Sequence, residues 1–213
     1  MPMPDEARLR IFLDTLYEAP PSFLAHMEME ALREGVPIIR KDTQRTLQCM
    51  LSLKKPESIL EIGTAVGFSS VFFCAHSGAY VETIEKDAAR VRKAEENIRK
   101  AGFAERIRLL EGNAEDILPG LDGPYDMIFL DAAKGQYLTY LPEILRLLKD
   151  GGLLLSDNVF INGDLLESGF AVERRFRTIH TRMREYLREI IRREGLVTTV
   201  LPIGDGLAVT VKQ

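Results

Sequence analysis

The stretch LEIGTAVGFSS, residues 60–70, decides the fold of this chain. Its apolar start is typical of a short buried strand, and the residues from Phe68 onward are typical of a helix. The turn between them contains Gly63 and Gly67, which let the backbone pass close to a ligand beside the free N–H groups at the helix start. The glycine spacing differs from the G-x-G-x-x-G of dinucleotide-binding domains, so an NAD-dependent oxidoreductase is disfavoured.

The same alternation of strand and helix continues along the chain. Helical segments separate four more strand-like segments, at residues 79–85, 106–112, 125–131 and 152–158. The last residues, LVTTVLPIGDGLAVTVKQ, predict an antiparallel hairpin. We therefore expect an α/β fold with a doubly wound, mostly parallel seven-stranded sheet, which binds ligands beyond the carboxyl ends of its strands.

The segment before the first strand has helical periodicity from Asp5 to about Leu53, and Asp42 is a candidate helix cap. We expect a single domain over residues 1–213, with a helical cap (1–53) and an α/β core (54–213).

Composition narrows the class of protein. Apolar residues make up 46% and charged residues 28% of the chain, and the net charge is -4, which argues against a protein that coats nucleic acid. Cys49 and Cys74 both lie in apolar helical patterns, so we expect two reduced core thiols. The sequence has no apolar run of roughly 18 residues and no apolar signal region at its start. We therefore expect no membrane span, and we expect a cytoplasmic location.

Polar residues follow the second and third strands. Glu85 ends the second strand 22 residues after Gly63, where a carboxylate can bind both hydroxyls of a ribose. Asn113 and Ala114 follow the third strand, where an adenine edge could lie. Together these strand ends indicate a nucleotide-like ligand.

Two carboxylates and an amide follow the next two strands. Asp131 ends the fourth strand, with Lys134 three residues later in DAAKGQY, and Asp157 and Asn158 end the fifth. Neighbouring strand ends would bring these hard oxygen ligands together, which favours Mg²⁺, Mn²⁺ or Ca²⁺ over zinc. The simpler alternative is that Asp157 and Asn158 begin a turn and Asp131 caps a helix.

The motifs EIGTAVGFS and DAAKGQY, with Glu85 between them, resemble class I S-adenosylmethionine (SAM)-dependent methyltransferases. They are most similar to the metal-dependent O-methyltransferases that include catechol and caffeoyl-CoA enzymes, over roughly residues 35–213. The resemblance implies a Rossmann-like methyltransferase fold, with Val36 and Pro37 closing over the methionine end of SAM. The implied cofactor site comprises Val36, Glu61, Gly63, Ser69, Glu85, Asn113, Ala114 and Asp131. Asn113 stands where many relatives have Asp, and its amide can still accept from the adenine amine.

The resemblance also implies a mechanism. A divalent ion held by Asp131, Asp157 and Asn158 would stabilise the deprotonated form of a substrate that offers two neighbouring oxygens. Lys134 would act as the general base, with Asp131 beside it as a second catalytic residue.

A late helix, from about Val172 to Arg193, carries a local net charge of 8 - 3 = +5 over residues 171–193. Helical spacing predicts a buried stripe of Val172, Phe176, Ile179, Met183, Leu187 and Ile190. It also predicts an opposite face suited to phosphate, formed by Arg174, Arg177, Arg184, Arg188 and Arg192. The simpler alternative is a solvated helix face.

This helix, DAAKGQY and the final hairpin resemble the bacterial tRNA 5-hydroxyuridine methyltransferases, although Ile161 and Asn162 stand where relatives have a basic residue. That resemblance implies methylation of 5-hydroxyuridine to 5-methoxyuridine at the wobble position, with the tRNA anticodon region as partner. The alternatives are a catechol- or caffeoyl-type enzyme for small vicinal-dihydroxy substrates, and a non-catalytic cofactor- or RNA-binding module. The resemblance and the apolar N-terminal helices also predict a homodimer.

Overall fold

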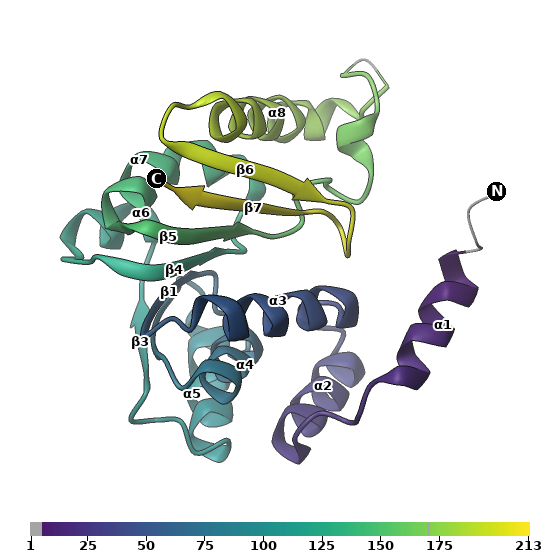
Figure 1. Cartoon of the computed structure of the whole chain (residues 1–213), viewed down its shortest axis with the longest axis vertical. Coiled ribbons are helices and arrows are strands. Elements are labelled where there is room, and N and C mark those ends of the chain that lie inside the picture. Colours follow the sequence, from purple (N-terminus) through teal and green to yellow (C-terminus); the bar gives the residue numbers. More distant parts are fainter. Residues whose placement is uncertain (1–5, 170) are drawn as a thin grey trace.

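A computed structural model describes residues 6–169 and 171–213, so the helical pattern expected from Asp5 begins just outside the described residues. Within that part of the chain, one sheet of seven strands lies between two layers of helices (Figure 1). The strands are β1 (Ser58–Ile62), β2 (Tyr80–Glu85), β3 (Ile107–Glu111), β4 (Tyr125–Leu130), β5 (Leu148–Ser156), β6 (Leu196–Leu201) and β7 (Leu207–Lys212).

The strand order is β3-β2-β1-β4-β5-β7-β6, with β1 to β5 parallel and β7 antiparallel to both β5 and β6. The predicted α/β fold and its terminal hairpin are therefore confirmed. The central strands are continuous apolar runs because helices cover both faces of the sheet, and Ile128, Phe129 and Leu130 of β4 are all fully buried. From β1 the strand order runs through β2 to β3 on one side of the sheet, and from β4 to β5 on the other side. The order therefore reverses between β1 and β4, and folds of this kind bind ligands at that boundary.

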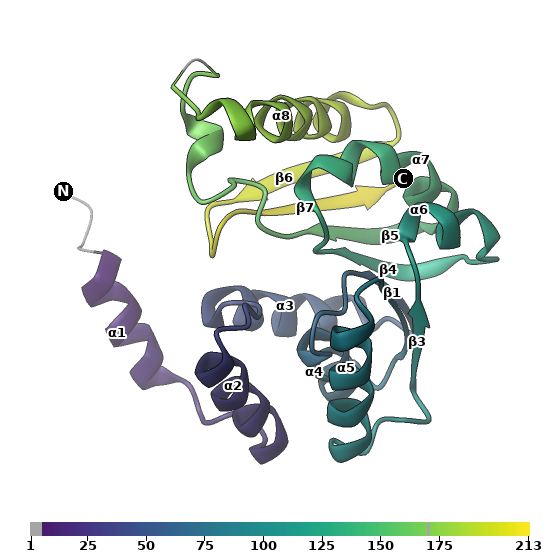
Figure 2. The same cartoon turned by 180° about the vertical axis from the view of Figure 1, so that it is seen from behind.

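Each helical layer packs on its own hydrophobic core (Figure 2). One face of the sheet is covered by α3 (Lys41–Lys54), α4 (Phe68–Ser77) and α5 (Ala88–Lys100). The other face is covered by α6 (Ala114–Ile117), α7 (Tyr137–Leu147) and α8 (Arg177–Arg192). Asp87 caps α5, since its carboxylate accepts from the backbone N–H groups of Ala89 and Arg90.

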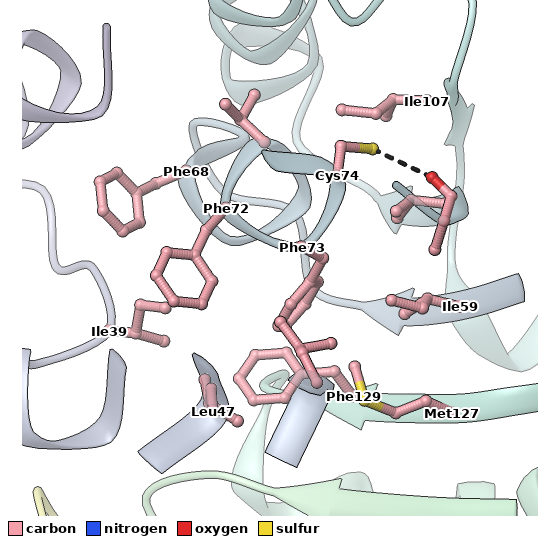
Figure 3. Packing of buried hydrophobic residues seen from close by; sticks show 14 of the residues in the cluster. Ile39, Leu47, Ile59, Phe68, Phe72, Phe73, Cys74, Ile107, Met127 and Phe129 are labelled. Atoms are coloured by element: carbon pink, nitrogen blue, oxygen red, sulfur yellow. Dashed lines mark hydrogen bonds between the residues drawn. The ribbon is translucent and has the colours of Figure 1, made fainter. Parts of the chain in front are cut away.

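The helix that follows the fold-deciding turn is anchored in the centre of its core (Figure 3). Phe68, Phe72 and Phe73 of α4 are buried, and the ring of Phe73 meets Phe129 of β4 edge-on with centroids 5.1 Å apart. The apolar residues after Gly67 thus fix the start of α4 against the sheet, which holds the turn at the pocket in place.

Three local expectations were wrong. Asp42 lies in the first turn of α3 and not at its cap, and its Oδ2 accepts from Gly204 N at 2.9 Å, because the final hairpin packs there. Cys49 is exposed, since α3 buries the face that carries Leu47 and Leu51, while Cys74 is buried as expected. The strand β5 starts at Leu148, earlier than residue 152, because Leu148 pairs with Tyr125 before a register shift.

The first two helices are α1 (Glu6–Leu16) and α2 (Ser22–Glu34). Figures 1 and 2 show α1 extending away from the body of the molecule, while α2 lies against the α3–α4 side. On α1, Ile11, Phe12 and Leu16 are exposed. Among the described helices, none is long and apolar enough to cross a membrane.

Candidate active site

A pocket of about 590 Å³ opens at the carboxyl ends of the parallel strands. Its wall is built from residues 37–40, 62–66, 68–69, 84–86, 112–114, 131–134, 157–158 and 161–162, together with Arg90, Tyr140 and Asp205. This is the location that the strand order favours, because β1 and β4 are neighbours there.

Gly63 is required by the close approach of two strand ends. Its φ is +105°, and a Cβ atom there would collide with the main-chain oxygen of Asp131. Gly67 serves helix packing instead, since a Cβ on it would meet Ala94 of α5 at 3.3 Å, and Gly67 is not part of the pocket wall. Only one of the two glycines singled out in the sequence therefore borders the ligand space.

Glu85 lies in the pocket wall at the end of β2 and is 7% exposed. Its Oε2 accepts from Ala65 N at 2.9 Å, and its Oε1 accepts from Lys86 N at 2.9 Å and Asp87 N at 3.0 Å. These backbone donors hold the carboxylate in one orientation at the pocket. Bonds of this kind leave lone pairs free, so the group can still accept from a ligand hydroxyl.

Glu61 lies under the pocket and not in its wall, although the sequence placed it among the lining residues. It is fully buried, and its Oε2 accepts from the hydroxyl groups of Ser70 and Thr83. Burial raises the pKa of Glu61 to about 7. Ser69, the neighbour of Ser70, does line the pocket.

The segment over one side of the pocket is residues 37–40, one position later than the sequence suggested. Val36 is half-buried and not in the wall, because its N–H closes α2 by donating to Ala31 O. Asn113 and Ala114 both line the pocket, at the start of α6. The Asn113 side chain makes no cap bond to α6.

The four residues singled out at the fourth and fifth strand ends converge. The Lys134 ammonium donates to Asp131 Oδ1 at 2.7 Å, to Asn158 Oδ1 at 3.1 Å and to the main-chain oxygen of Asp157 at 3.4 Å. Asp157 is only 2% exposed, and its Oδ1 accepts from Asn158 N at 2.8 Å. Burial, reinforced by the Asp131 carboxylate, raises the pKa of Asp157 to about 7.

These residues fit a hard divalent cation. Oxygens of Asp131 and Asn158 already converge on one positive charge, that of Lys134, and the buried Asp157 carboxylate beside them is costly to ionise without a nearby cation. Asn158 has φ +55°, the left-handed conformation that Asn tolerates better than most residues. Among the described residues, no three or more His, Cys, Asp and Glu side chains are grouped so that they could hold a metal ion, so a zinc-type site is not indicated.

Tyr137 was missed by sequence reasoning. Its hydroxyl lies 2.9 Å from Lys134 Nζ, 3.1 Å from the main-chain oxygen of Leu130 and 3.0 Å from that of Asp157. Burial, with the carboxylates of Asp131 and Asp157 adding to it, raises the pKa of Tyr137 well above its usual value, so the phenol keeps its proton. The only available signal was its position at the end of the DAAKGQY motif.

Asp205 lies in the pocket wall and joins segments that are distant in the sequence. Sequence reasoning missed this residue as well. The Asp205 carboxylate accepts from Asn162 N at 2.8 Å, and its main-chain oxygen accepts from Phe160 N at 2.9 Å. On the other side of the turn, Arg40 Nη1 donates to Gly204 O at 3.2 Å. Ile161 and Asn162 line the mouth as a loop with left-handed backbone, φ +54° at both.

The predicted arginine face is only partly free. Arg184 is half-buried and donates to the main-chain oxygens of Leu165 at 2.7 Å and Glu167 at 2.8 Å, so it binds the loop before the helix. Arg177 Nε donates to Val172 O at 3.1 Å. Arg188 and Arg192 are exposed on α8, and none of the five predicted arginines lies in the pocket wall.

The late helix also begins later than expected, and its inward face is only partly the predicted one: Val172, Met183 and Ile190 are buried as expected. Arg174 lies in a short 3-10 helix (Arg174–Phe176), and α8 starts at Arg177. Phe176, Ile179 and Leu187 are only half-buried. The buried residues of α8 are His180, Met183, Tyr186 and Ile190. His180 and Tyr186 can be buried because each finds a hydrogen-bond partner, the Glu167 carbonyl and the Ser156 hydroxyl.

A mostly parallel seven-stranded sheet with an antiparallel hairpin at one edge, and an acidic residue at the end of β2 facing the pocket, defines a Rossmann-like, SAM-dependent methyltransferase. Residues 22–213 match the O-methyltransferase family, and the chain belongs to that family.

Two curated relatives are named catechol O-methyltransferase. The protein from Niastella koreensis is 37% identical over 142 residues, which are 62% of this chain and 64% of that protein. The alignment thus spans slightly less than two thirds of the Niastella protein. The protein from Mycobacterium tuberculosis is 32% identical over 168 residues, 76% of each chain.

Solved structures match almost the whole chain. A Staphylococcus aureus protein, provisionally described as a caffeoyl-CoA O-methyltransferase, is 31% identical with a TM-score of 0.87, over 97% of this chain and 98% of that one. An O-methyltransferase from Bacillus cereus, in complex with SAH, has the same fold at 22% identity, with a TM-score of 0.85 over 97% of both chains.

Proposed function

We propose that this protein is a divalent-metal-dependent O-methyltransferase of small aromatic substrates that carry two neighbouring oxygens, as in a catechol. The observation that carries the proposal is the convergence of Asp131 and Asn158 oxygens on one cationic position, with the buried Asp157 carboxylate next to them. The names of the two catechol O-methyltransferase relatives support the substrate class.

The residues of the chain have distinct tasks in this proposal. Glu85 orients the ribose of SAM, and Gly63, Ser69, Asn113 and Ala114 line the pocket around the cofactor. When both are bound, the metal would stabilise a deprotonated substrate oxygen, and SAM would supply the methyl group.

The proton of the substrate hydroxyl is taken by Lys134. Its Nζ lies in the pocket wall, between the side chains proposed to bind the metal. Asp131, Asp157 and Asn158 would hold the metal, and a metal fixed in this way would help to orient the substrate oxygen toward the methyl group.

A tRNA substrate is the second candidate. The nucleoside 5-hydroxyuridine offers a comparable oxygen pair, and Arg174, Arg177, Arg188 and Arg192 are exposed. None of these arginines lies in the pocket wall, and Arg184 binds loop carbonyls, so the segment offers less to a phosphate backbone than the sequence suggested. A non-catalytic binding module is disfavoured because the complete Asp131, Lys134, Asp157 and Asn158 set has no use in simple binding.

We further propose a homodimer formed through the N-terminal helices. Ile11, Phe12 and Leu16 of α1 are 67%, 58% and 61% exposed, and a second copy could cover them. Size-exclusion chromatography with light scattering tests this directly, and a monomer at all concentrations would refute it. A cytoplasmic location remains a prediction.

The function is tested by incubating the protein with SAM and Mg²⁺ and either catechol or tRNA that contains 5-hydroxyuridine, with product detection by mass spectrometry. We expect methylation of catechol, reversible loss of activity with EDTA, and loss of activity in Asp157→Ala with SAM binding kept. Asp150→Ala is the control, since that side chain is 81% exposed and pairs with Lys212. Full activity in rigorously metal-free buffer would refute the metal mechanism, and methylation of tRNA alone would select the second candidate.

A further inference from the structure

Tyr137 is a fully buried tyrosine in contact with the reaction centre but outside the pocket wall. It is the first residue of α7, and its hydroxyl reaches the main-chain oxygens of Leu130, at the end of β4, and Asp157, just after β5. The phenol therefore lies under the point where the two strand ends carry the proposed metal ligands.

The number of hydrogens on each group fixes the direction of the hydrogen bonds that Tyr137 makes. A phenol has one hydrogen, so Tyr137 can donate fully to only one of the two carbonyl oxygens, at 3.0 and 3.1 Å. An ammonium has donors only, so the 2.9 Å contact with Lys134 is a bond from Nζ to the phenol oxygen. Tyr137 thus links the amine to the backbone of the strand ends.

The acceptors of Lys134 fall into two groups. Asp131 Oδ1 and Asn158 Oδ1 belong to side chains that would bind the cation, and a bound cation repels the amine from them. The remaining acceptors are the Tyr137 hydroxyl at 2.9 Å and the Asp157 main-chain oxygen at 3.4 Å. Of these two, the phenol makes the shorter contact.

We propose that Tyr137 is a positioning residue that holds the Lys134 amine beside the reacting oxygen when the metal occupies the side chains of Asp131 and Asn158. This inference rests on the proposed function, because it assumes the metal and the role of Lys134 as base. It differs from a purely structural role, in which the phenol would serve only to satisfy the two buried carbonyls.

The chain offers a matched control in Tyr186. This tyrosine is equally buried, its ring meets that of Tyr137 edge-on at 5.4 Å, and its hydroxyl bonds to the Ser156 hydroxyl at 2.6 Å. Both Tyr137→Phe and Tyr186→Phe remove one buried hydroxyl from the same core, but only the first removes an acceptor of Lys134.

The experiment compares the two variants in the full-length protein by two readouts. With catechol at saturating SAM and Mg²⁺, we expect Tyr137→Phe to lower kcat by about 10- to 100-fold with KM changed less than about threefold, because misplacing a catalytic group costs turnover. With Mg²⁺ present and substrate absent, we expect Lys134 of Tyr137→Phe to be labelled several-fold faster by an amine-reactive reagent, as measured by peptide mass spectrometry. Tyr186→Phe should resemble the native protein in both.

The two readouts separate this inference from the proposed function. Equal labelling of Lys134 in the two variants, or equal kcat, overturns the positioning role whatever the melting temperatures are. If the native protein methylates neither catechol nor tRNA, the proposed function fails, and labelling of Lys134 alone decides whether Tyr137 holds the amine.

Discussion

The ammonium of Lys134 lies 2.7 Å from Asp131 Oδ1, within the group of oxygens that a divalent cation would use. A metal bound as proposed would therefore compete with Lys134 for the same carboxylate. Its binding would move the ammonium away from Asp131 and Asn158, toward the substrate side of the site or onto its other acceptors. In the proposed mechanism, the base and the metal site are thus coupled by electrostatic repulsion.

This competition predicts that Lys134→Met binds metal more tightly while losing turnover. Removal of a unit charge a few ångströms from the cation should raise Mn²⁺ affinity by roughly 10-fold or more, measured by electron paramagnetic resonance titration. Lys149→Met is the control, because that lysine pairs with Asp126 and is not in the pocket wall. Equal Mn²⁺ affinity in Lys134→Met and the native protein would show that the amine does not occupy the metal position.

Glu85→Gln should weaken SAM binding by about 1–3 kcal/mol, because the ribose hydroxyls lose a charged acceptor. The amide keeps the shape of the side chain, although its NH₂ replaces one of the two oxygens, so either Ala65 N or the N–H groups of Lys86 and Asp87 lose their acceptor. Calorimetry measures the affinity, and the melting temperature separates binding from stability. Glu95→Gln, on the exposed side of α5, is the control, and an unchanged SAM affinity in Glu85→Gln would remove Glu85 from the cofactor site.

Glu61 should make stability depend on pH. Its pKa is raised from 4.5 to about 7 in the folded protein, so the folded state binds the proton more tightly than the unfolded state. The resulting stabilisation is complete below pH 4.5 and is lost as the pH rises through about 7, a change of roughly 3 kcal/mol.

Glu61→Gln isolates that contribution, because the other titrating groups are common to both proteins. Urea unfolding at pH 5 and pH 7.5 should show that the native protein loses about 2 kcal/mol more than the variant between the two values, because part of the full effect lies outside this pH range. Parallel stability curves would mean that Glu61 is ionised at neutral pH, with its charge compensated by the hydroxyl groups around it.

The arginines of α8 should separate into two kinds. Arg184→Ala should lower the melting temperature, because the carbonyls of Leu165 and Glu167 lose their donor. The pair Arg188→Ala with Arg192→Ala should leave stability and catechol turnover unchanged, since both side chains are exposed. If the pair instead reduces the log–log salt slope of tRNA binding by roughly 1.5 to 2, the exposed arginines contact phosphate.

Much of the site could be predicted because it depends on short-range pattern and sheet geometry alone. The apolar runs and glycine turns set the order of strands and helices, and a parallel sheet brings the ends of neighbouring strands to one edge. Asp131, Asp157 and Asn158 had to converge once β4 and β5 were neighbours.

Other features depend on the rotation of each helix about its axis and on the positions of the loops. The local sequence pattern does not specify either of these. The inward face of α8 includes His180 and Tyr186, which count as polar in a periodicity analysis, and their partners come from distant segments. For the same reason Arg184 could not be recognised as a loop anchor.

The sequence by itself determined the fold, the class of reaction and the residues at the strand ends. These features follow from the order of residues within individual strands, turns and helices. Only the tertiary structure decided that Glu61 is buried outside the pocket wall, that Asp205 lies in that wall and binds Asn162, and that Tyr137 binds Lys134. Each of these contacts joins side chains whose directions are set by packing between elements, and packing is a property of the whole core.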